Sequence, residues 1–342
     1  MATINMLEET ANYLLNHCFV LGGVEDQRAK YLYVQDHLDE VRAVFAPLGY
    51  SVLLYPAPLQ AAALVNGHEG SQARLLKYES ILLLVLRLLY LQKRESLAAN
   101  ADEVLVTDPG YPGTLSALAL ASATPVFFPL DAQGQPEFAA MERAVSVKTR
   151  AILVASPNNP TGQILSAAAW TQLAALAEKQ DLALIVDAAY EQLSWKPLNF
   201  KALRPCRHRV IFIGSFSKTY AMTGWRLGWI SAPRRWGEAL LKTHQALVSG
   251  VAGFVQQAAC TALTLPVDPW RQTVAEQSEY SWQRLNEIGL TCPQPEGSFY
   301  CFPSIVSTGL TSEQFALKLA EQAGVAVLPG TLFCQHGAGH VR

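Results

Sequence analysis

The sequence carries little charge of either sign, which excludes strongly electrostatic functions for the chain as a whole. Only 16% of its 342 residues are charged, and 26 basic side chains face 28 acidic ones, for a net charge of −2. A chain with this net charge has no overall electrostatic attraction to nucleic acid or to an anionic membrane. The net charge does not exclude a basic patch on one face of the protein. Half of the residues are apolar, enough for a large core, so global disorder is excluded. At about 100–200 residues per domain, the length predicts two or three domains.

Paired cysteines, metal-binding spacings and membrane spans are also missing. The six cysteines form no CxxC pair and the seven histidines form no HExxH motif, so we expect reduced thiols and no metal site. The most apolar run, Ile81 to Leu91, contains Arg87 and is shorter than the about 20 residues of a membrane helix. The first residues lack the basic and apolar regions of a signal peptide. These absences predict a cytoplasmic protein with no membrane partner.

From about residue 104 onward, short apolar runs alternate with helical stretches. The apolar runs predict buried strands at 104–107, 125–130, 151–155, 182–186 and 210–213. The stretches between them predict helices near 112–122, 137–147 and 165–178. This alternation predicts an α/β fold with a mostly parallel sheet and helices on both faces. Functional groups in such sheets gather beyond the carboxyl ends of the strands.

The first hundred residues have a different pattern. Helices are predicted at 5–17, 27–47 and 74–94, with short strands at 51–55 and 61–65 before the last helix. Two helices, a small β-wing and a further helix make the pattern of a winged-helix unit. The alternative is that the helix at 74–94 is a core helix of the α/β domain, because periodicity alone specifies topology weakly.

Four polar motifs follow predicted strands in the second part of the chain. They are DPGY (108–111), SPNNPTG (156–162), DAAY (187–190) and GSFSKTYAMTGWR (214–226). Taken singly, each motif has a structural explanation that requires no function: turns rich in Pro, Asn and Gly, a helix cap at Asp187, and a solvated charge at Lys218. Their common position at strand ends predicts that they meet at one edge of the sheet.

In this order and spacing, the motifs of residues 102–342 resemble the class I/II aminotransferases, which are pyridoxal-phosphate (PLP) enzymes of fold type I. PEGSFY (295–300), GVAVLPGTLF (324–333) and GHVR (339–342) add to the resemblance. It implies a PLP-binding large domain at 101–290 and a truncated small domain at 291–342. The implied reaction is transfer of an amino group between an amino acid and a 2-oxo acid, although lyases on the same scaffold share these motifs.

The resemblance implies a role for each residue around the cofactor ring. Lys218, Asp187 and Tyr190 are the catalytic residues, with Lys218 linked covalently to the PLP aldehyde. Asp187 pairs with the protonated pyridine nitrogen, which keeps the ring an electron sink. Tyr190 and Asn159 hydrogen-bond the ring's phenolic oxygen, and Tyr111 stacks on the ring.

Other residues are assigned to the phosphate and the substrate. By the same resemblance, Ser215, Ser217 and Arg226 hold the phosphate of PLP. Arg342, with Asn159, binds the substrate α-carboxylate, which a guanidinium matches with two parallel hydrogen bonds. We therefore expect these side chains to converge on one pocket, with Asp187 and Arg226 at its opposite ends.

Residues 1–100 are similar instead to the winged-helix subunits of bacterial condensin-like (SMC) complexes. The motifs that carry this similarity are LLNHCFVL, Leu48-Gly49-Tyr50 and RLLKYESILLLVLRLLY. It leaves a second function open: a chimeric or inactive protein whose N-terminal unit serves protein or DNA interaction. Nucleic acid is otherwise not an expected partner, and a homodimer is expected if the family mode of assembly is kept.

The sequence also departs from the aminotransferase pattern. A Gly-[Ala/Ser/Thr] turn that opens the phosphate-binding helix is expected near 80–84, where the chain has Ser-Ile-Leu-Leu-Leu. The chain ends at Arg342, so we expect this arginine to lack the strands and helix that brace it in the family. Both departures predict weak PLP binding and slow transamination.

Overall fold

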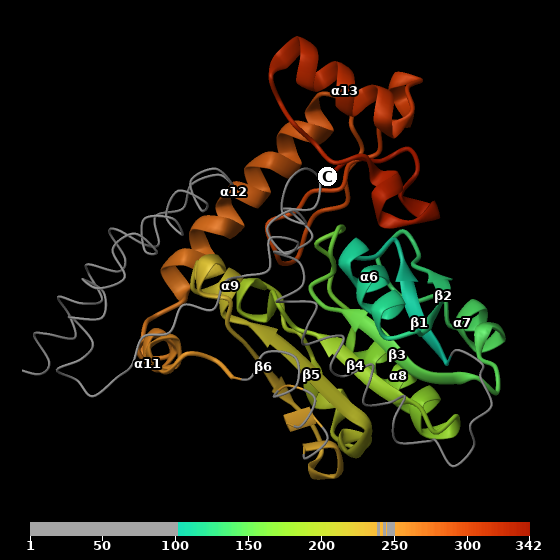
Figure 1. Cartoon of the computed structure of the whole chain (residues 1–342). Helices are drawn as coiled ribbons and strands as arrows, with labels where there is room; N and C mark the ends of the chain where they lie inside the picture. The colour runs from blue at the N-terminus through green and yellow to red at the C-terminus, as the bar shows by residue number, and fades with distance from the viewer. Residues whose placement is uncertain (1–101, 238–239, 242–243, 245–249) are drawn as a thin grey trace, which may run out of the picture. The chain divides into compact units, whose positions relative to one another are not determined.

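The computed structural model describes residues 102–237, 240–241, 244 and 250–342 (Figure 1). The predicted winged-helix unit at 1–100 lies outside the described residues and stays a prediction. None of the helices in the described part is long and apolar enough to cross a membrane.

Strands and helices alternate along the first part of the described chain. In order these elements are β1 (Glu103–Asp108), α6 (Pro112–Leu120), β2 (Thr124–Pro129), α7 (Phe138–Ala144), β3 (Thr149–Ala155), α8 (Ala167–Lys179), β4 (Ala183–Asp187), β5 (Val210–Ser215), α9 (Phe216–Thr219) and β6 (Gly228–Ser231). The later helices are α11 (Gly253–Ala262), α12 (Asp268–Glu287) and α13 (Ser312–Ala323). The five predicted strands and three predicted helices are all present.

The element ends differ from the prediction by a few residues. The largest difference is at α7, which ends at Ala144 instead of 147. There the chain turns, because the Thr149 amide donates to the Ser146 carbonyl over 3.1 Å and Thr149 Oγ1 accepts from the Ser146 amide over 2.9 Å.

The six strands form one sheet in the order β2-β1-β3-β4-β5-β6. The first five run parallel, and β6 runs antiparallel to β5. The predicted mostly parallel sheet is confirmed, and β6 is an element that the sequence did not reveal. Because the five parallel strands point the same way, the loops after them meet at one edge.

Helices cover both faces of the sheet, as predicted. In β1, Val104 and Val106 pack in one buried cluster with Leu118 of α6. Leu105, between them in the chain, packs in a second cluster with Trp170 of α8 and Met141 of α7. Successive side chains of a strand point to opposite faces, so the two clusters lie on the two sides of the sheet.

The residues after α12 have a small core of their own. Leu290, Ile305 and Val341 are buried together, with Phe315 of α13 packed against them. Backbone hydrogen bonds tie the end of the chain to this region, since the Val341 amide donates to the Pro303 carbonyl over 3.2 Å. The predicted division into domains at 290/291 stays a prediction.

Candidate active site

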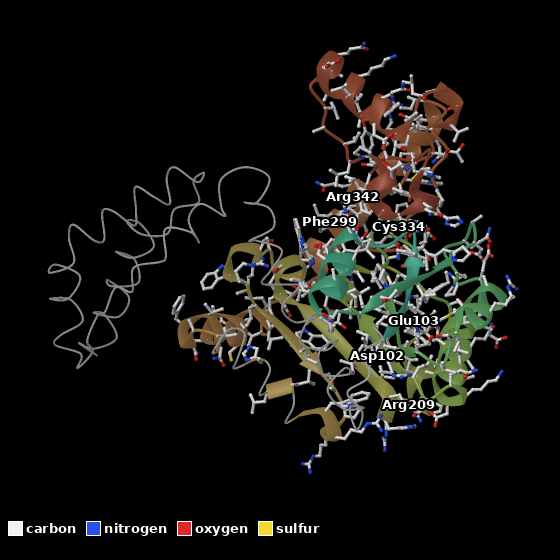
Figure 2. All side chains as sticks on the ribbon, turned by 45° about the vertical axis from the view of Figure 1, so that its right-hand side comes forward. Asp102, Glu103, Arg209, Phe299, Cys334 and Arg342 are labelled. Atoms are coloured by element: carbon white, nitrogen blue, oxygen red, sulfur yellow. The ribbon has the colours of Figure 1, made fainter. Side chains whose placement is uncertain are left out.

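The candidate site lies where the parallel strands end. Asp187 is the last residue of β4, Ser215 is the last residue of β5, and Ser156 follows β3 directly. Figure 2 shows Phe299, Cys334 and Arg342 toward one end of the sheet and Arg209 toward the other. Each predicted motif therefore enters the site from its own strand.

Lys218 lies in α9, a single helical turn that follows β5. Ser215 caps this turn, because its Oγ accepts a hydrogen bond of 3.1 Å from the Ser217 amide. The Lys218 side chain is half-buried, and this burial lowers its pKa, with further lowering by the charges of Arg226 and Arg342. Such an environment favours the neutral amine, the form that attacks a carbonyl carbon.

A tight loop after α9 brings Arg226 back toward Lys218. Its backbone is left-handed, with φ of 52°, at the end of the short 3-10 helix Thr223–Trp225. Its Nη1 donates to the Thr223 carbonyl over 2.7 Å. Burial lowers the pKa of Arg226, and an electrostatic interaction with Tyr111 opposes this shift. The guanidinium is thus fixed near both the amine and the predicted stacking ring.

Asp187 and Tyr111 line one pocket, with Cys334 on its wall. Asp187 Oδ1 accepts a hydrogen bond of 3.0 Å from the Ala189 amide, which fixes the carboxylate at the strand end. Asp187 therefore does cap the backbone that follows β4.

Tyr190 is buried beside this carboxylate. Its hydroxyl lies 2.5 Å from the hydroxyl of Tyr300. Burial raises the pKa of Tyr190 well above its ordinary value, and Tyr300 and Asp187 raise it further. Tyr190 therefore stays protonated and can act as a hydrogen-bond donor at neutral pH.

Arg342 is held firmly, so the expectation that it lacks support is wrong. Its amide donates to the Leu328 carbonyl over 2.9 Å, and its carbonyl accepts from the Leu328 amide over 3.0 Å. Its guanidinium carbon lies 4.3 Å from the ring centre of Tyr300 and 4.8 Å from that of Phe333. Nη1 donates to Asn159 Oδ1 over 2.8 Å. Backbone pairing and two aromatic rings therefore brace this arginine.

Several of the predicted site residues interact with one another, while convergence of the whole set on one pocket stays a prediction. Arg342 contacts Asn159 and acts electrostatically on Lys218 and Tyr190. The charges of Arg226 and Arg342 both act on Lys218, and those of Asp187 and Arg342 both act on Tyr190. Such a cluster suits a ligand with two anionic groups, because each arginine can neutralise one of them.

Three aromatic residues of the site have no role in the sequence-based prediction. Tyr300 and Phe333 enclose Arg342, and the ring centre of Phe299 lies 5.5 Å from Lys218 Nζ. Phe299 and Tyr300 belong to PEGSFY, and Phe333 belongs to GVAVLPGTLF. Both motifs indicated the family but not these contacts.

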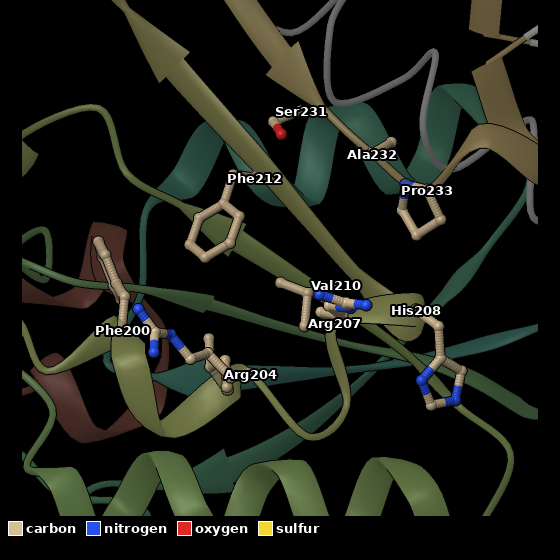
Figure 3. Close-up of a pocket in the computed structure, with 10 residues that line it drawn as sticks. Phe200, Arg204, Arg207, His208, Val210, Phe212, Ser231, Ala232 and Pro233 are labelled. Carbon is tan, nitrogen blue, oxygen red and sulfur yellow. The ribbon is translucent and has the colours of Figure 1, made fainter.

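A larger cavity of about 460 Å3 lies at the other end of β5 (Figure 3). It is lined by Val210, which begins β5, and by Ser231, which ends the antiparallel β6. Phe200, Arg204 and Phe212 also line it. None of the predicted site residues does, so this cavity is separate from the candidate active site.

Comparison with known proteins identifies the same family as the motifs. The family described as aminotransferase class I and II matches residues 94–342. The aromatic-amino-acid aminotransferase 2 of Thermococcus litoralis is 35% identical over 251 residues, which are 70% of this chain and 64% of the relative. An aspartate aminotransferase of Pyrococcus horikoshii is 34% identical over 258 residues, 72% of this chain and 66% of the relative.

Comparison with solved structures also finds aminotransferases. An aromatic aminotransferase from Pyrococcus horikoshii superposes with a TM-score of 0.70 at 32% identity, covering 78% of this chain and 71% of that one. A double mutant of the Thermus thermophilus aspartate aminotransferase also gives 0.70, at 27% identity, with 77% and 68% covered. The chain spans about 64% of the length of the first curated relatives that it matches. Because the match takes in well over half of the sequence and every motif at the strand ends, the chain belongs to the class I and II aminotransferase family.

Proposed function

We propose that this chain binds PLP through Lys218 and transfers an amino group between an amino acid and a 2-oxo acid. Members of its family depend on PLP. The observation that carries the proposal is the position of Lys218. Its half-buried amine is close enough to Arg226 and Arg342 for both charges to lower its pKa, and its Nζ lies 5.5 Å from the ring centre of Phe299.

The residues present fit PLP. The phosphate would be held by Arg226 and by the hydroxyls of Ser215, which caps α9, and Ser217, which lies in α9. Asp187 would hold the pyridine nitrogen, and Tyr111, which lines the same pocket, would cover the ring. When bound there, the cofactor supplies an electron sink for breaking the bond to the substrate's α-hydrogen.

The protein's own groups would bind and orient the substrate and move its proton. Arg342 would bind the α-carboxylate, and its contact with Asn159 fixes the angle of the guanidinium fork. Tyr190 would donate its hydrogen bond to the ring's phenolic oxygen. The amine of Lys218 would take the proton from the substrate and return it, and the lowering of its pKa favours the form that accepts a proton.

Several finer points stay predictions from the sequence. These are the homodimer, the cytoplasmic location, and weak PLP binding because the phosphate turn is missing near 80–84, a region outside the described residues. The interaction function proposed for residues 1–100 also concerns residues outside the described part. The substrates are proposed only as an amino acid and a 2-oxo acid.

The experiment that tests the proposal is covalent trapping of PLP. Purified protein is mixed with PLP, its visible absorption is recorded, borohydride is added, and the labelled peptide is identified by mass spectrometry. We expect the label on Lys218 and loss of the absorption band in Lys218→Ala. Lys201→Ala, which removes an exposed lysine, is the matched control and should behave like the wild type. Labelling of another lysine, or an unchanged band in Lys218→Ala, would refute the assignment.

A further inference from the structure

Tyr300 touches two parts of the candidate active site at once. Its hydroxyl lies 2.5 Å from that of Tyr190, the predicted donor to the cofactor ring. Its ring face lies 4.3 Å from the guanidinium carbon of Arg342, the predicted ligand of the substrate carboxylate. One half-buried side chain therefore connects the cofactor end of the site with the substrate end.

The turn that carries Tyr300 is fixed against the rest of the site. The Ser298 amide donates to the Leu193 carbonyl over 2.9 Å, and the Gly297 amide donates to the Gly162 carbonyl over 3.0 Å. Gly297 allows close approach, because a Cβ there would lie 2.4 Å from Cγ of Pro157. The PEGSFY turn is thus packed on the SPNNPTG loop, which fixes the position of Tyr300.

We propose that Tyr300 is a positioning residue that orients the Tyr190 hydroxyl and the Arg342 guanidinium for the same reaction. This inference rests on the proposed function. Tyr300 acts through these two neighbours.

The first part of the inference follows from counting hydroxyl protons. A tyrosine hydroxyl has one proton to donate. When Tyr190 donates to the ring oxygen of PLP, the short hydrogen bond with Tyr300 must run from Tyr300 to Tyr190. Donation into a hydroxyl strengthens that hydroxyl's own donation by about 10–30%. Tyr300 therefore strengthens the hydrogen bond that Tyr190 makes to the cofactor.

The second part follows from the planar guanidinium of Arg342. Tyr300 and Phe333 lie 4.3 Å and 4.8 Å from it, and Nη1 is engaged by Asn159. A guanidinium has five N–H donors, so those on the remaining edge can meet a carboxylate. The two rings restrict the plane in which this edge lies, which orients the bound carboxylate.

Two substitutions separate these parts. Tyr300→Phe removes the hydroxyl and keeps the ring, so only the cofactor end should change. Weaker donation to the ring oxygen favours protonation of the lysine-linked cofactor. The midpoint of its pH-dependent absorbance change should therefore rise by about 0.5 pH units.

Tyr300→Leu also removes the ring. Binding of pyruvate to the PLP-loaded protein, measured by the change in absorbance, should then weaken about 3- to 10-fold.

A double-variant cycle tests whether Tyr300 acts through Tyr190. In the Tyr190→Phe background, adding Tyr300→Phe should cause no further shift of the absorbance midpoint. Tyr280→Phe, which removes an exposed hydroxyl on α12, is the matched control and should leave midpoint and pyruvate binding unchanged. If Tyr300→Leu does not fold, the Tyr300→Phe arm and the cycle still decide the hydroxyl's role.

The outcomes distinguish the inference from the proposed function. If the wild type shows no Lys218-dependent absorption band, the proposed function fails and the inference fails with it. If the wild type binds PLP through Lys218 but Tyr300→Phe leaves the midpoint unchanged, the proposed function stands and the inference is overturned. An additive shift in the double variant would likewise overturn the claim that Tyr300 acts through Tyr190.

Discussion

Cys334 has a backbone conformation that a side chain rarely adopts, and replacing it with glycine should stabilise the protein. Its φ is 78° and its ψ is −166°, a region that glycine occupies almost alone. The strain released is about 1–3 kcal/mol. Two effects lower the stability of the glycine variant. The greater backbone entropy of glycine in the unfolded chain costs about 0.5–1 kcal/mol, and the loss of a half-buried sulfur costs about 0.5 kcal/mol. We expect Cys334→Gly to raise the free energy of unfolding by about 1 kcal/mol.

The assay is urea unfolding of Cys334→Gly beside Cys334→Ala. Alanine also lacks the thiol but keeps the Cβ, so it retains the strain and should lower stability by about 0.5 kcal/mol. At a slope of about 2–3 kcal/mol per molar urea, the glycine variant should unfold at a midpoint about 0.3–0.5 M higher than the wild type. An alanine variant as stable as the glycine variant would refute the reasoning, because the gain would then come from losing the thiol.

Two further predictions concern the strand end and the lysine. Gly214→Ala should lower the free energy of unfolding by about 1–3 kcal/mol, because the added Cβ would lie 2.0 Å from the Trp229 ring. Gly253→Ala, whose Cβ meets nothing within 4 Å, is its control in the same urea assay, and equal midpoints for the two variants would contradict the prediction. Burial, Arg226 and Arg342 lower the pKa of Lys218 from 10.5 in the folded protein, so between the two pKa values the unfolded chain binds more protons at this residue. Without PLP, the contribution of Lys218 to the free energy of unfolding should therefore increase as the pH rises toward 10.5. Lys218→Met should remove that gain, and urea midpoints that change with pH as in the wild type would show that the lysine is not shifted.

The sequence determined the architecture of the parallel sheet because its signals are local. Buried strands are short apolar runs, and the helices between them have their own periodicity, so both could be located from neighbouring residues. The roles predicted for Lys218, Asp187 and Arg226 came from the family resemblance that the strand-end motifs carry, and parallel strands bring those ends to one edge.

The tertiary structure alone decided the contacts between distant segments. Tyr190 and Tyr300 are 110 residues apart, and Asn159 and Arg342 are 183 residues apart. No local pattern records such pairs, because each depends on how the PEGSFY turn and the end of the chain fold back onto the sheet. For the same reason the sequence alone misled about Arg342. Its support comes from Leu328, Tyr300 and Phe333, which reach it only through packing.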